Sequence, residues 1–466
     1  MNPTPHPTDA GLFNVDLIRR YDKSGPRYTS YPTAVQFHDG FSVEDYRAAA
    51  DRSNVAGGPL SIYTHIPFCD TVCYYCACNK VVTKDRGRAQ PYIDDVIQEI
   101  ALQGALFDEG RVVDQLHWGG GTPTFLSHAQ MRQLMAGIGQ NFALKTDDTG
   151  EYSIEIDPRE ADAHTIAVLR ELGFNRISLG VQDFNERVQE AVNRIQSVAE
   201  TRIVVDAARA EGFHGISLDL IYGLPHQTRD SFMKTLDTVI AMAPDRLSIF
   251  NYAHLPTRFK PQRRINTDEL PSAAEKLRIL GGSIERLAEA GYVLIGMDHF
   301  AKPTDPLATA QQNGTLHRNF QGYSTHAECD MVAFGVSSIS QVGGAFSQNT
   351  KDLTAYHTAV TAGRLPIERG YVLTSEDHLR RRVISDLISH FSVDFAAINQ
   401  NYGIDFINYF AAALRELAPM QADELVAIHA DSIEVLPRGK LLIRNICMAF
   451  DEYLSSEGMQ RFSKVI

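Results

Sequence analysis

The sequence lacks the features that would place the chain in a membrane, on a secretory route or on nucleic acid. Its apolar runs all fall short of the roughly 18 residues of a membrane helix, and its N-terminal segment has no apolar signal core. Basic residues are in the minority, with 44 Lys and Arg against 57 Asp and Glu and a formal net charge of -13. A basic surface supplies most of the affinity for DNA and RNA. We therefore expect a cytoplasmic protein without nucleic-acid or membrane partners.

Cysteine is scarce, with six residues in 466, but four of the six are clustered. In a long chain without a secretory signal, such a cluster is typical of metal binding. A structural zinc site normally uses two separated pairs of Cys or His ligands, and the sequence has no second CxxC pair. Three thiolates on one loop, with one iron left open, suit a [4Fe–4S] cluster better. Zinc stays the alternative for the clustered residues, Cys69, Cys73, Cys76 and Cys78.

Short runs of β-forming residues alternate with amphipathic segments such as 92–108 and 273–290. This alternation predicts a parallel sheet covered by helices, either a β/α barrel or an open doubly wound sheet. Unusual polar and glycine residues fall at the C-terminal ends of the runs, where barrels gather their ligands, so the barrel is favoured. The predicted strands are Leu60–Ile66, Val113–Trp118, Tyr152–Ile156, Arg176–Val181, Gly215–Tyr222, Arg246–Tyr252 and Tyr292–Met297.

The flanks of this unit differ in character. Residues 1–55 are rich in turn formers and are expected to be irregular. Beyond residue 365, helices are predicted at His378–Phe391 and Phe406–Leu417, and Ser432–Arg444 is predicted to be a hairpin that turns at Pro437–Gly439. The predicted units are an N-terminal cap (1–55), the β/α unit (56–300), a connecting segment (301–364) and a mainly helical, winged-helix-like lid (365–466).

The spacing Cys69-x3-Cys73-x2-Cys76 resembles that of the radical S-adenosylmethionine (SAM) enzymes, and Gly119–Thr122 resembles their GGxT element. The resemblance implies an α/β fold with a partial (β/α) TIM-like barrel of the radical SAM type. It also implies a cluster held by Cys69, Cys73 and Cys76, with SAM on the fourth iron. Reduction of the cluster then cleaves SAM to methionine and a 5'-deoxyadenosyl radical. Cys78 is not needed as a ligand.

Further segments, among them GPRYTSYPT, EIDPRE and GTLHRNFQGYST, resemble the oxygen-independent coproporphyrinogen III oxidases over nearly the whole chain. The resemblance implies oxidative decarboxylation of the ring A and B propionates of coproporphyrinogen III to vinyl groups, giving protoporphyrinogen IX in haem biosynthesis. It implies two bound SAM molecules and an electron donor such as flavodoxin or ferredoxin. A monomer is our default expectation.

The candidate site residues fall into four groups, of which the two SAM sites are implied by the resemblance. The first SAM site would involve Tyr63, Tyr75, Gly120, Glu155, Gln182, Arg194 and Asp219, and the second Gly121, Thr122, Ala253 and Ile339. Tyr63, His65 and Cys78 are the candidate catalytic side chains. His317 and Arg318 are candidate partners for the substrate propionates on chemical grounds, because carboxylates need cationic partners.

The competing hypothesis is that the chain is a haem chaperone, a kind of protein that keeps the cysteine loop but binds haem. Such chaperones lack the fourth cysteine and the YTSYPT segment and carry an HNxxYW element. This chain has Cys78 and Tyr28–Thr33, and its only tryptophan is Trp118 beside the glycine run. The enzyme is therefore favoured.

Overall fold

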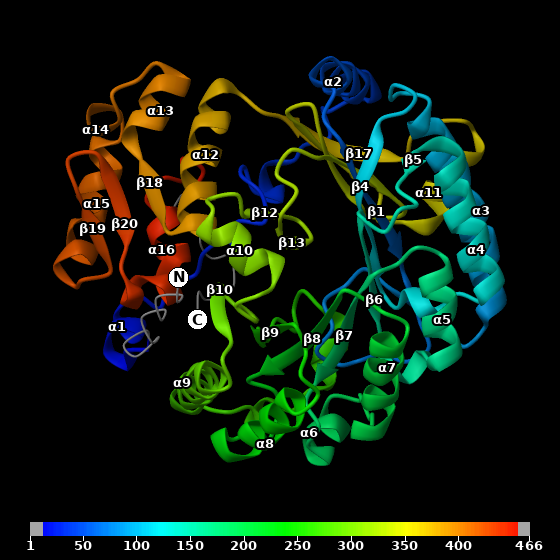
Figure 1. Ribbon diagram of the computed structural model, residues 1–466, viewed down its shortest axis with the longest axis horizontal. Coiled ribbons are helices and arrows are strands. Elements are labelled where there is room, and N and C mark those ends of the chain that lie inside the picture. The colour runs from blue at the N-terminus through cyan, green and yellow to red at the C-terminus, as the bar shows by residue number, and fades with distance from the viewer. Residues whose placement is uncertain (1–12, 455–466) are drawn as a thin grey trace.

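The structure is a computed structural model that describes residues 13–454, and a curved sheet forms its centre (Figure 1). Seven neighbouring strands of this sheet run parallel to one another. Six of them match predicted strands closely, whereas the seventh, β14, was not predicted. In spatial order they are β14 (Asp330–Phe334), β1 (Leu60–Ile66), β4 (Val112–Gly120), β6 (Glu151–Ile156), β7 (Arg176–Gln182), β8 (Gly215–Tyr222) and β9 (Arg246–Asn251).

Antiparallel strands extend the sheet at both sides. On one side β11 (His299–Ala301) lies between β9 and β10 (Val293–Gly296), so the predicted parallel strand at Tyr292–Met297 is wrong in its pairing. On the other side β15 (Ile339–Val342), β16 (Ala345–Asn349) and β17 (Ile367–Val372) follow β14. Among the described residues β10 and β17 each have one neighbour in the sheet. The sheet is therefore a partial barrel, as predicted.

Helices that follow the parallel strands cover the outer face of the sheet (Figure 1). Several begin at Ser or Thr residues that form a capping box, which satisfies free backbone N–H groups at the helix start. The covering helices are α3 (Ala89–Gly104), α4 (His128–Asn141), α5 (Ala163–Glu171), α7 (Val198–Ala210), α8 (Arg229–Ile240) and α9 (Ala273–Glu289). Shorter elements are β5 (Ala143–Leu144), α6 (Glu186–Ala191), α10 (Pro306–Gln312) and α11 (Leu353–Thr361).

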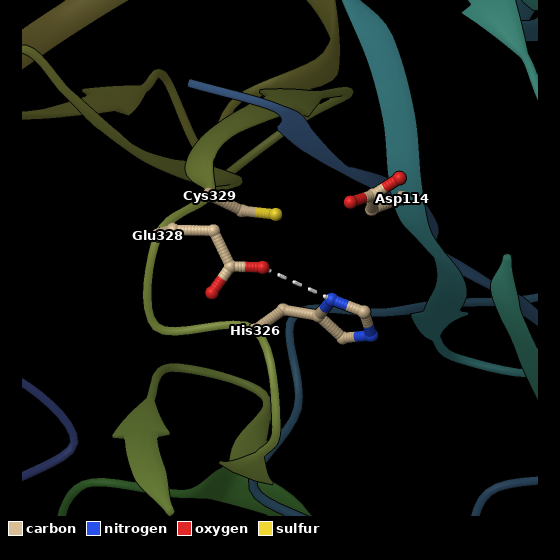
Figure 2. A group of neighbouring side chains, drawn as sticks. All are labelled: Asp114, His326, Glu328 and Cys329. Carbon is tan, nitrogen blue, oxygen red and sulfur yellow. Dashed lines mark ion pairs between the residues drawn. The ribbon is translucent and has the colours of Figure 1, made fainter. Parts of the chain in front are cut away.

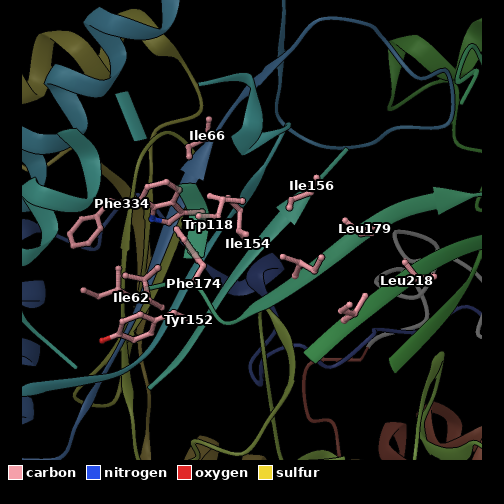
Figure 3. Packing of buried hydrophobic residues seen from close by; sticks show 14 of the residues in the cluster. Ile62, Ile66, Trp118, Tyr152, Ile154, Ile156, Phe174, Leu179, Leu218 and Phe334 are labelled. Carbon is pink, nitrogen blue, oxygen red and sulfur yellow. The ribbon is translucent and has the colours of Figure 1, made fainter. Parts of the chain in front are cut away.

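The two faces of the curved sheet carry opposite chemistry. On the outer face apolar residues such as Ile154 and Leu218 are buried under the helices, and Trp118 meets Phe174 edge-to-face with ring centroids 4.9 Å apart (Figure 3). The inner face carries polar residues from alternate positions, including His117 and Asp219. The helices therefore stabilise the sheet from outside, and the concave side is left for ligands.

The C-terminal lobe has a separate hydrophobic core. Its helices are α12 (Ser375–His390), α13 (Phe395–Tyr402), α14 (Phe406–Tyr409), α15 (Ala411–Ala422) and α16 (Ile443–Met448), and its sheet is β18 (Ser392–Asp394), β20 (Ser432–Val435) and β19 (Val426–Ile428). The predicted hairpin at Ser432–Arg444 is wrong. β20 pairs with β19 instead, and Pro437–Leu442 forms a 3-10 helix that leads into α16. Proline suits the first turn of a helix because it has no N–H to leave unpaired.

The N-terminal segment is less irregular than predicted, since it contains α1 (Val15–Arg20) and the capped helix α2 (Val43–Ala56). Tyr21, Tyr28 and Tyr31 enter the core of the C-terminal lobe. Arg444 donates a hydrogen bond to the carbonyl oxygen of Pro26 at 2.8 Å. The described part of the N-terminal segment is thus packed against the C-terminal lobe. Residues 1–12 and 455–466 of the predicted end units lie outside the described residues. Over residues 13–454 no helix combines the length and apolarity needed to span a bilayer.

A buried carboxyl group predicts how stability depends on pH. Glu99 on α3 accepts hydrogen bonds from Tyr356, Asn349, Gln103 and the Gly335 N–H. Burial outweighs these bonds and raises the pKa of Glu99 to about 7. Above pH 4.5 the folded protein keeps a proton on Glu99 that the unfolded chain releases. The contribution of this group to the free energy of unfolding is therefore largest at low pH and is lost as pH rises through 7.

We expect the free energy of unfolding to fall between pH 5 and pH 8 by on the order of 3 kcal/mol from this group, and Glu99→Gln to remove that part of the pH dependence. Denaturant unfolding followed by circular dichroism measures it. Glu171→Gln, at an exposed ion pair with Arg132, is the control and should keep the wild-type slope. An equal slope in wild type and Glu99→Gln would contradict the assignment.

Candidate active site

The cysteine loop follows the C-terminal end of β1 and borders a cavity of about 210 Å³. Its base is a short parallel pair of β2 (Phe68–Cys69) and β3 (Val81–Val82). The wall of this cavity includes twelve of the predicted site residues, which come from five neighbouring segments of the barrel rim. They are Cys69, Cys73, Tyr75, Cys76, Cys78, Gly120, Gly121, Thr122, Glu155, Gln182, Arg194 and Asp219.

The glycine run holds the loop against β1 through backbone hydrogen bonds. The Gly121 N–H donates to the carbonyl oxygen of Ile66 and the Thr122 N–H donates to that of Phe68, both at 2.8 Å. A Cβ atom on Gly121 would lie 2.6 Å from the Phe68 carbonyl oxygen. A Cβ atom on Gly120, which has a φ of +118°, would lie 2.8 Å from the His65 ring. Glycine is therefore required here by close backbone approach.

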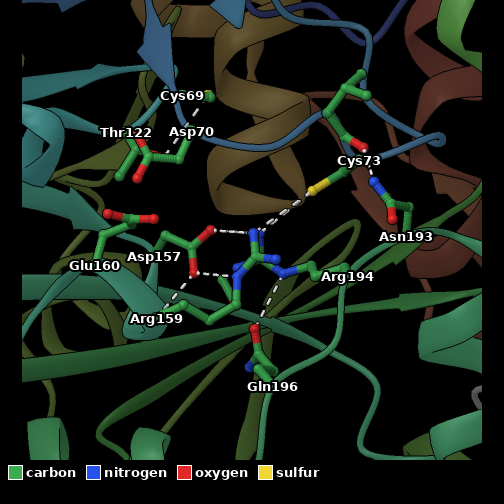
Figure 4. Close-up of polar contacts among 12 residues, drawn as sticks. Cys69, Asp70, Cys73, Thr122, Asp157, Arg159, Glu160, Asn193, Arg194 and Gln196 are labelled. Carbon is green, nitrogen blue, oxygen red and sulfur yellow. Dashed lines mark hydrogen bonds and ion pairs between the residues drawn. The ribbon is translucent and has the colours of Figure 1, made fainter. Parts of the chain in front are cut away.

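An ion-pair network lies directly behind Cys73 (Figure 4). The Asp157 carboxylate accepts hydrogen bonds from Arg194 at 2.9 Å and from Arg159 at 2.6 Å. Both guanidinium groups also approach the Cys73 sulfur, at 3.6 and 3.9 Å. Burial would raise the pKa of Asp157, but the two arginines outweigh it and lower this pKa. The network is therefore ionised and places positive charge beside the thiol.

Asp157 and Arg159 were not predicted as site residues. They stand in the segment EIDPRE, two and four residues after Glu155, and this segment follows a strand end. That position was the available signal. It was missed because the acidic residue at the end of the strand drew the functional assignment.

Glu155 and Asp219, two carboxyl groups of the cavity wall, have pKa values shifted in opposite directions. Glu155 accepts a hydrogen bond from the Gly120 N–H at 3.1 Å and faces the His117 ring at 3.5 Å. Burial opposes ionisation of Glu155, yet these partners lower its pKa. Burial raises the pKa of Asp219 to about 6, although Ser178 donates a hydrogen bond to it at 3.0 Å. Of these two carboxyl groups, Glu155 is therefore ionised, whereas Asp219 titrates near pH 6.

Tyr63 and His65 lie behind the cavity wall. The Tyr63 ring stacks on His117, with centroids 5.8 Å apart, and its hydroxyl lies 3.1 Å from Nδ1 of His65. Nε2 of His65 lies 3.1 Å from the carbonyl oxygen of Asn79, which can only accept. Burial lowers the pKa of His65. His65 is therefore a neutral imidazole with its proton on Nε2, and its Nδ1 accepts a hydrogen bond from the Tyr63 hydroxyl.

The remaining predicted residues lie at three other places. Ala253 borders a neighbouring cavity, and its carbonyl oxygen shares the Gln262 side-chain amide with the carbonyl oxygen of Tyr75. Ile339 packs against Phe37, Phe346 and Leu373. His317 and Arg318 belong to β12 (His317–Asn319), which pairs with β13 (Gly322–Ser324), and they border a small cleft with Tyr28–Tyr31.

Arg318 has unused hydrogen-bonding capacity. It is buried, its guanidinium carbon lies 4.7 Å above the Tyr323 ring, and Nε and Nη1 have no hydrogen-bond partner. An unpaired nitrogen also occurs on Arg246, which lines the polar cavity inside the barrel together with Glu155 and Asp219, whereas Nε of Arg176 in the same wall pairs with Glu151 at 3.3 Å. Buried donors of this kind are costly unless a ligand pairs with them.

The spacing of the clustered thiols bears on the choice between zinc and an iron–sulfur cluster. Over residues 13–454, a single group of three or more His, Cys, Asp and Glu residues has its ligand atoms within 4.8 Å of one another, and it does not include these cysteines. Sulfur ligands of one tetrahedral zinc ion lie about 3.8 Å apart, given bonds of about 2.3 Å. A multi-iron cluster suits the wider spread. With a partial parallel barrel and a three-cysteine loop after its first strand, these features define the class of radical SAM enzymes.

Comparisons with known proteins agree with this class. The radical SAM superfamily model matches residues 63–239, and the HemN C-terminal domain model matches residues 373–442. The oxygen-independent coproporphyrinogen III oxidase of Pseudomonas aeruginosa is 57% identical over 98% of this chain and 100% of its own length. That of Escherichia coli is 48% identical over 97% of this chain and 98% of its own.

A solved structure of coproporphyrinogen III oxidase (HemN) from Escherichia coli, described as a radical SAM enzyme, superposes with a TM-score of 0.91 at 47% identity. It covers 95% of this chain and 99% of that chain. The chain therefore belongs to the family of oxygen-independent coproporphyrinogen III oxidases. Membership carries with it the [4Fe–4S] cluster and SAM of the radical SAM class.

The close approach at Gly121 yields a prediction. Gly121→Ala would force the Phe68 backbone away and displace the cysteine loop, so we expect iron and sulfide incorporation after anaerobic reconstitution to fall severalfold. Gly139→Ala is the control, because its Cβ would make only an ordinary 3.6 Å contact with Leu144. Iron content measures both. Wild-type iron content in Gly121→Ala would contradict the role given to this contact.

Proposed function

We propose that this chain catalyses the oxygen-independent oxidative decarboxylation of coproporphyrinogen III to protoporphyrinogen IX. Two propionates, on rings A and B, each become a vinyl group with loss of CO2. The observation that carries the proposal is the cysteine loop over a cavity rich in polar groups, in a chain 57% identical to a named enzyme of this activity. The unpaired nitrogens of Arg318 and Arg246 suit a substrate with several carboxylates.

The residues present fit the cofactors of the class. Cys69, Cys73 and Cys76 would hold the [4Fe–4S] cluster, which together with SAM supplies a 5'-deoxyadenosyl radical when it is reduced. Arg194 and Arg159 would counter the negative charge of the cluster thiolates, because both face the Cys73 sulfur. The remaining first-site contacts to SAM are Tyr63, Tyr75, Gly120, Glu155, Gln182, Arg194 and Asp219.

Glu155 is ionised, and Asp219 is ionised above about pH 6. Both carboxylates are then suited to accept hydrogen bonds from ribose hydroxyls or an amino group. Gln182 has a φ of +66° at an irregularity in the pairing of β7 with β8. A bulge of this kind re-aims a side chain, and here the amide is turned back over Gly180, into the cavity.

A second SAM molecule is proposed at Gly121, Thr122, Ala253 and Ile339. The Gln262 amide supports the proposal for Ala253, because it bridges the Ala253 and Tyr75 carbonyl oxygens at 3.3 and 3.0 Å and so joins this segment to the cysteine loop. Ile339 lies in a separate apolar cluster. It is proposed to contact the second SAM molecule where that ligand extends to this cluster.

The candidate catalytic side chains have distinct proposed roles. Tyr63 and His65 position the wall beneath the glycine run, through the hydroxyl-to-Nδ1 contact and the stack on His117. Cys78 donates a hydrogen bond to the Cys76 sulfur, which lowers the pKa of Cys76. It is proposed to remain a thiol at the edge of the cavity, and not to be a cluster ligand.

Further properties complete the proposal. The unit boundaries 1–55, 56–300, 301–364 and 365–466 are kept, with the last unit as a lid. A cytoplasmic location and a flavodoxin- or ferredoxin-like donor suit a thiol-held cluster, since thiols stay reduced in that compartment. The chain is proposed to act as a monomer, without nucleic-acid or membrane partners.

The function is tested anaerobically with reconstituted protein, reductant, SAM and coproporphyrinogen III. We expect protoporphyrinogen IX, methionine and 5'-deoxyadenosine, and loss of all three with Cys73→Ala. Cys447→Ala, in the core of the C-terminal lobe, is the matched control and should keep its iron and activity. Tight haem binding without any product would favour the chaperone and overturn the proposal.

The substrate contact is tested with Arg318→Gln. Loss of a charged hydrogen bond costs roughly 1.5–3 kcal/mol, so we expect KM for coproporphyrinogen III to rise about 10- to 100-fold while SAM binding stays unchanged. Arg286→Gln, whose side chain pairs with Asp237 on the outer helices, should leave KM unaltered. Unchanged KM in Arg318→Gln would remove this residue from the substrate site.

A further inference from the structure

Four side chains of metal-binding type converge at the edge of the sheet opposite the cysteine loop. Asp114, His326, Glu328 and Cys329 each offer one ligand atom, and these atoms all lie within 4.8 Å of one another. Figure 2 shows the four side chains directed toward a shared space. The residues of this group, here called the edge cluster, have no part in the activity described above.

The register of three strands brings the edge cluster together. Leu60, the first residue of β1, pairs with Val113 of β4 on one side and with Asp330 of β14 on the other. Asp114 follows Val113, and Cys329 precedes Asp330. The edge cluster therefore spans the N-terminal end of β1, whereas the cysteine loop follows its C-terminal end. Seven residues of strand, at about 3.3 Å each, separate the two sites by about 20 Å.

The spacing and the chemistry of the edge cluster suit a zinc-class ion. The Glu328 oxygen lies 3.5 Å from Nδ1 of His326, close to the distance of about 3.4 Å between N and O ligands of one tetrahedral zinc ion. The other pairs of ligand atoms lie within 4.8 Å of one another, so they need to close by little more than 1 Å at most. Thiolate, imidazole and carboxylate are all ligand types that zinc binds.

Charge balance supports the same ion. The Cys329 thiolate and the two carboxylates carry three negative charges, and Lys145 lies 2.6 Å from Asp114. A divalent cation together with the Lys145 ammonium balances them.

Access to the edge cluster is open on the side of Glu328. Its side chain is 54% exposed and that of His326 is 19% exposed, whereas Cys329 is buried at the floor. An ion can therefore enter from solvent and reach the thiol last.

We propose that Asp114, His326, Glu328 and Cys329 form a structural site for Zn²⁺ or a similar divalent cation. The ion ties the loop 325–329 to the start of β4. This loop leads from the β12–β13 hairpin, which carries Arg318, and Ser324 at the end of that hairpin receives a hydrogen bond from Gln115 at 3.1 Å. Binding at the edge cluster thus steadies the hairpin beside the barrel interior.

The test uses the cluster-loaded full chain, so that the cysteine loop is already filled. The protein is passed over a chelating resin and titrated with Zn²⁺ against a chromophoric chelator under anaerobic conditions. We expect one zinc ion per chain, and His326→Ala and Cys329→Ala each to weaken binding by at least about 100-fold, since even loss of an outer-shell partner costs 10- to 100-fold. Glu328→Gln, at the exposed ligand, should also weaken binding.

Controls keep this result separate from folding and from the cluster. Cys447→Ala should bind zinc as the wild type does, and circular dichroism confirms that each variant is folded. His326→Ala serves where Cys329→Ala fails to fold, because His326 lies nearer the surface. In the cobalt-substituted protein a thiolate-to-metal absorption band should be present in wild type and absent in Cys329→Ala. Absence of stoichiometric zinc in wild type, or zinc binding unchanged by His326→Ala, would overturn the proposal.

Discussion

The candidate active site depends on a pair of neighbouring backbone hydrogen bonds. They attach Gly121 to the end of β1 and Thr122 to β2, and together they form one contact between the glycine run and the cysteine loop. The contact is possible only without a side chain at Gly121, because the Phe68 carbonyl oxygen occupies the place of a Cβ atom. It fixes the cysteine loop on one side and the start of the next segment on the other. The cavity wall, with Glu155 bonded to the Gly120 N–H, is built from this junction.

The two faces of the sheet differ in chemistry, and this difference makes the polar cavity possible. The outer face is sealed by apolar residues under helices, so the free energy of folding comes chiefly from that side. The inner face can therefore carry ionisable groups. Their burial is unfavourable, and the favourable packing of the outer face offsets it. Asp157 illustrates the local solution, since two arginines compensate its burial while they also face the Cys73 sulfur.

Features encoded by local sequence could be predicted, whereas features made by distant pairing could not. Six parallel strands, the cysteine loop and the glycine run follow from period-two patterns and spacing, and twelve predicted residues meet in one cavity because parallel strands end at one rim. The hairpin predicted at Pro437 failed since a proline also begins a helical turn. β11 and β14 were missed because short runs of mixed residues become strands only through neighbours supplied by the fold. Ile339 came from resemblance alone, and it lies on β15, an antiparallel strand that the alternation of strands and helices does not predict.

The buried indole described above has an optical consequence. Trp118 is the only tryptophan of the chain and immediately precedes the glycine run, with its ring sealed beneath the outer helices. The tryptophan fluorescence of the protein therefore arises at one known point, next to the cofactor cavity. An absorbing cluster in that cavity would take up the excitation energy of this single emitter, so the chain has a built-in reporter of how fully its cysteine loop is loaded.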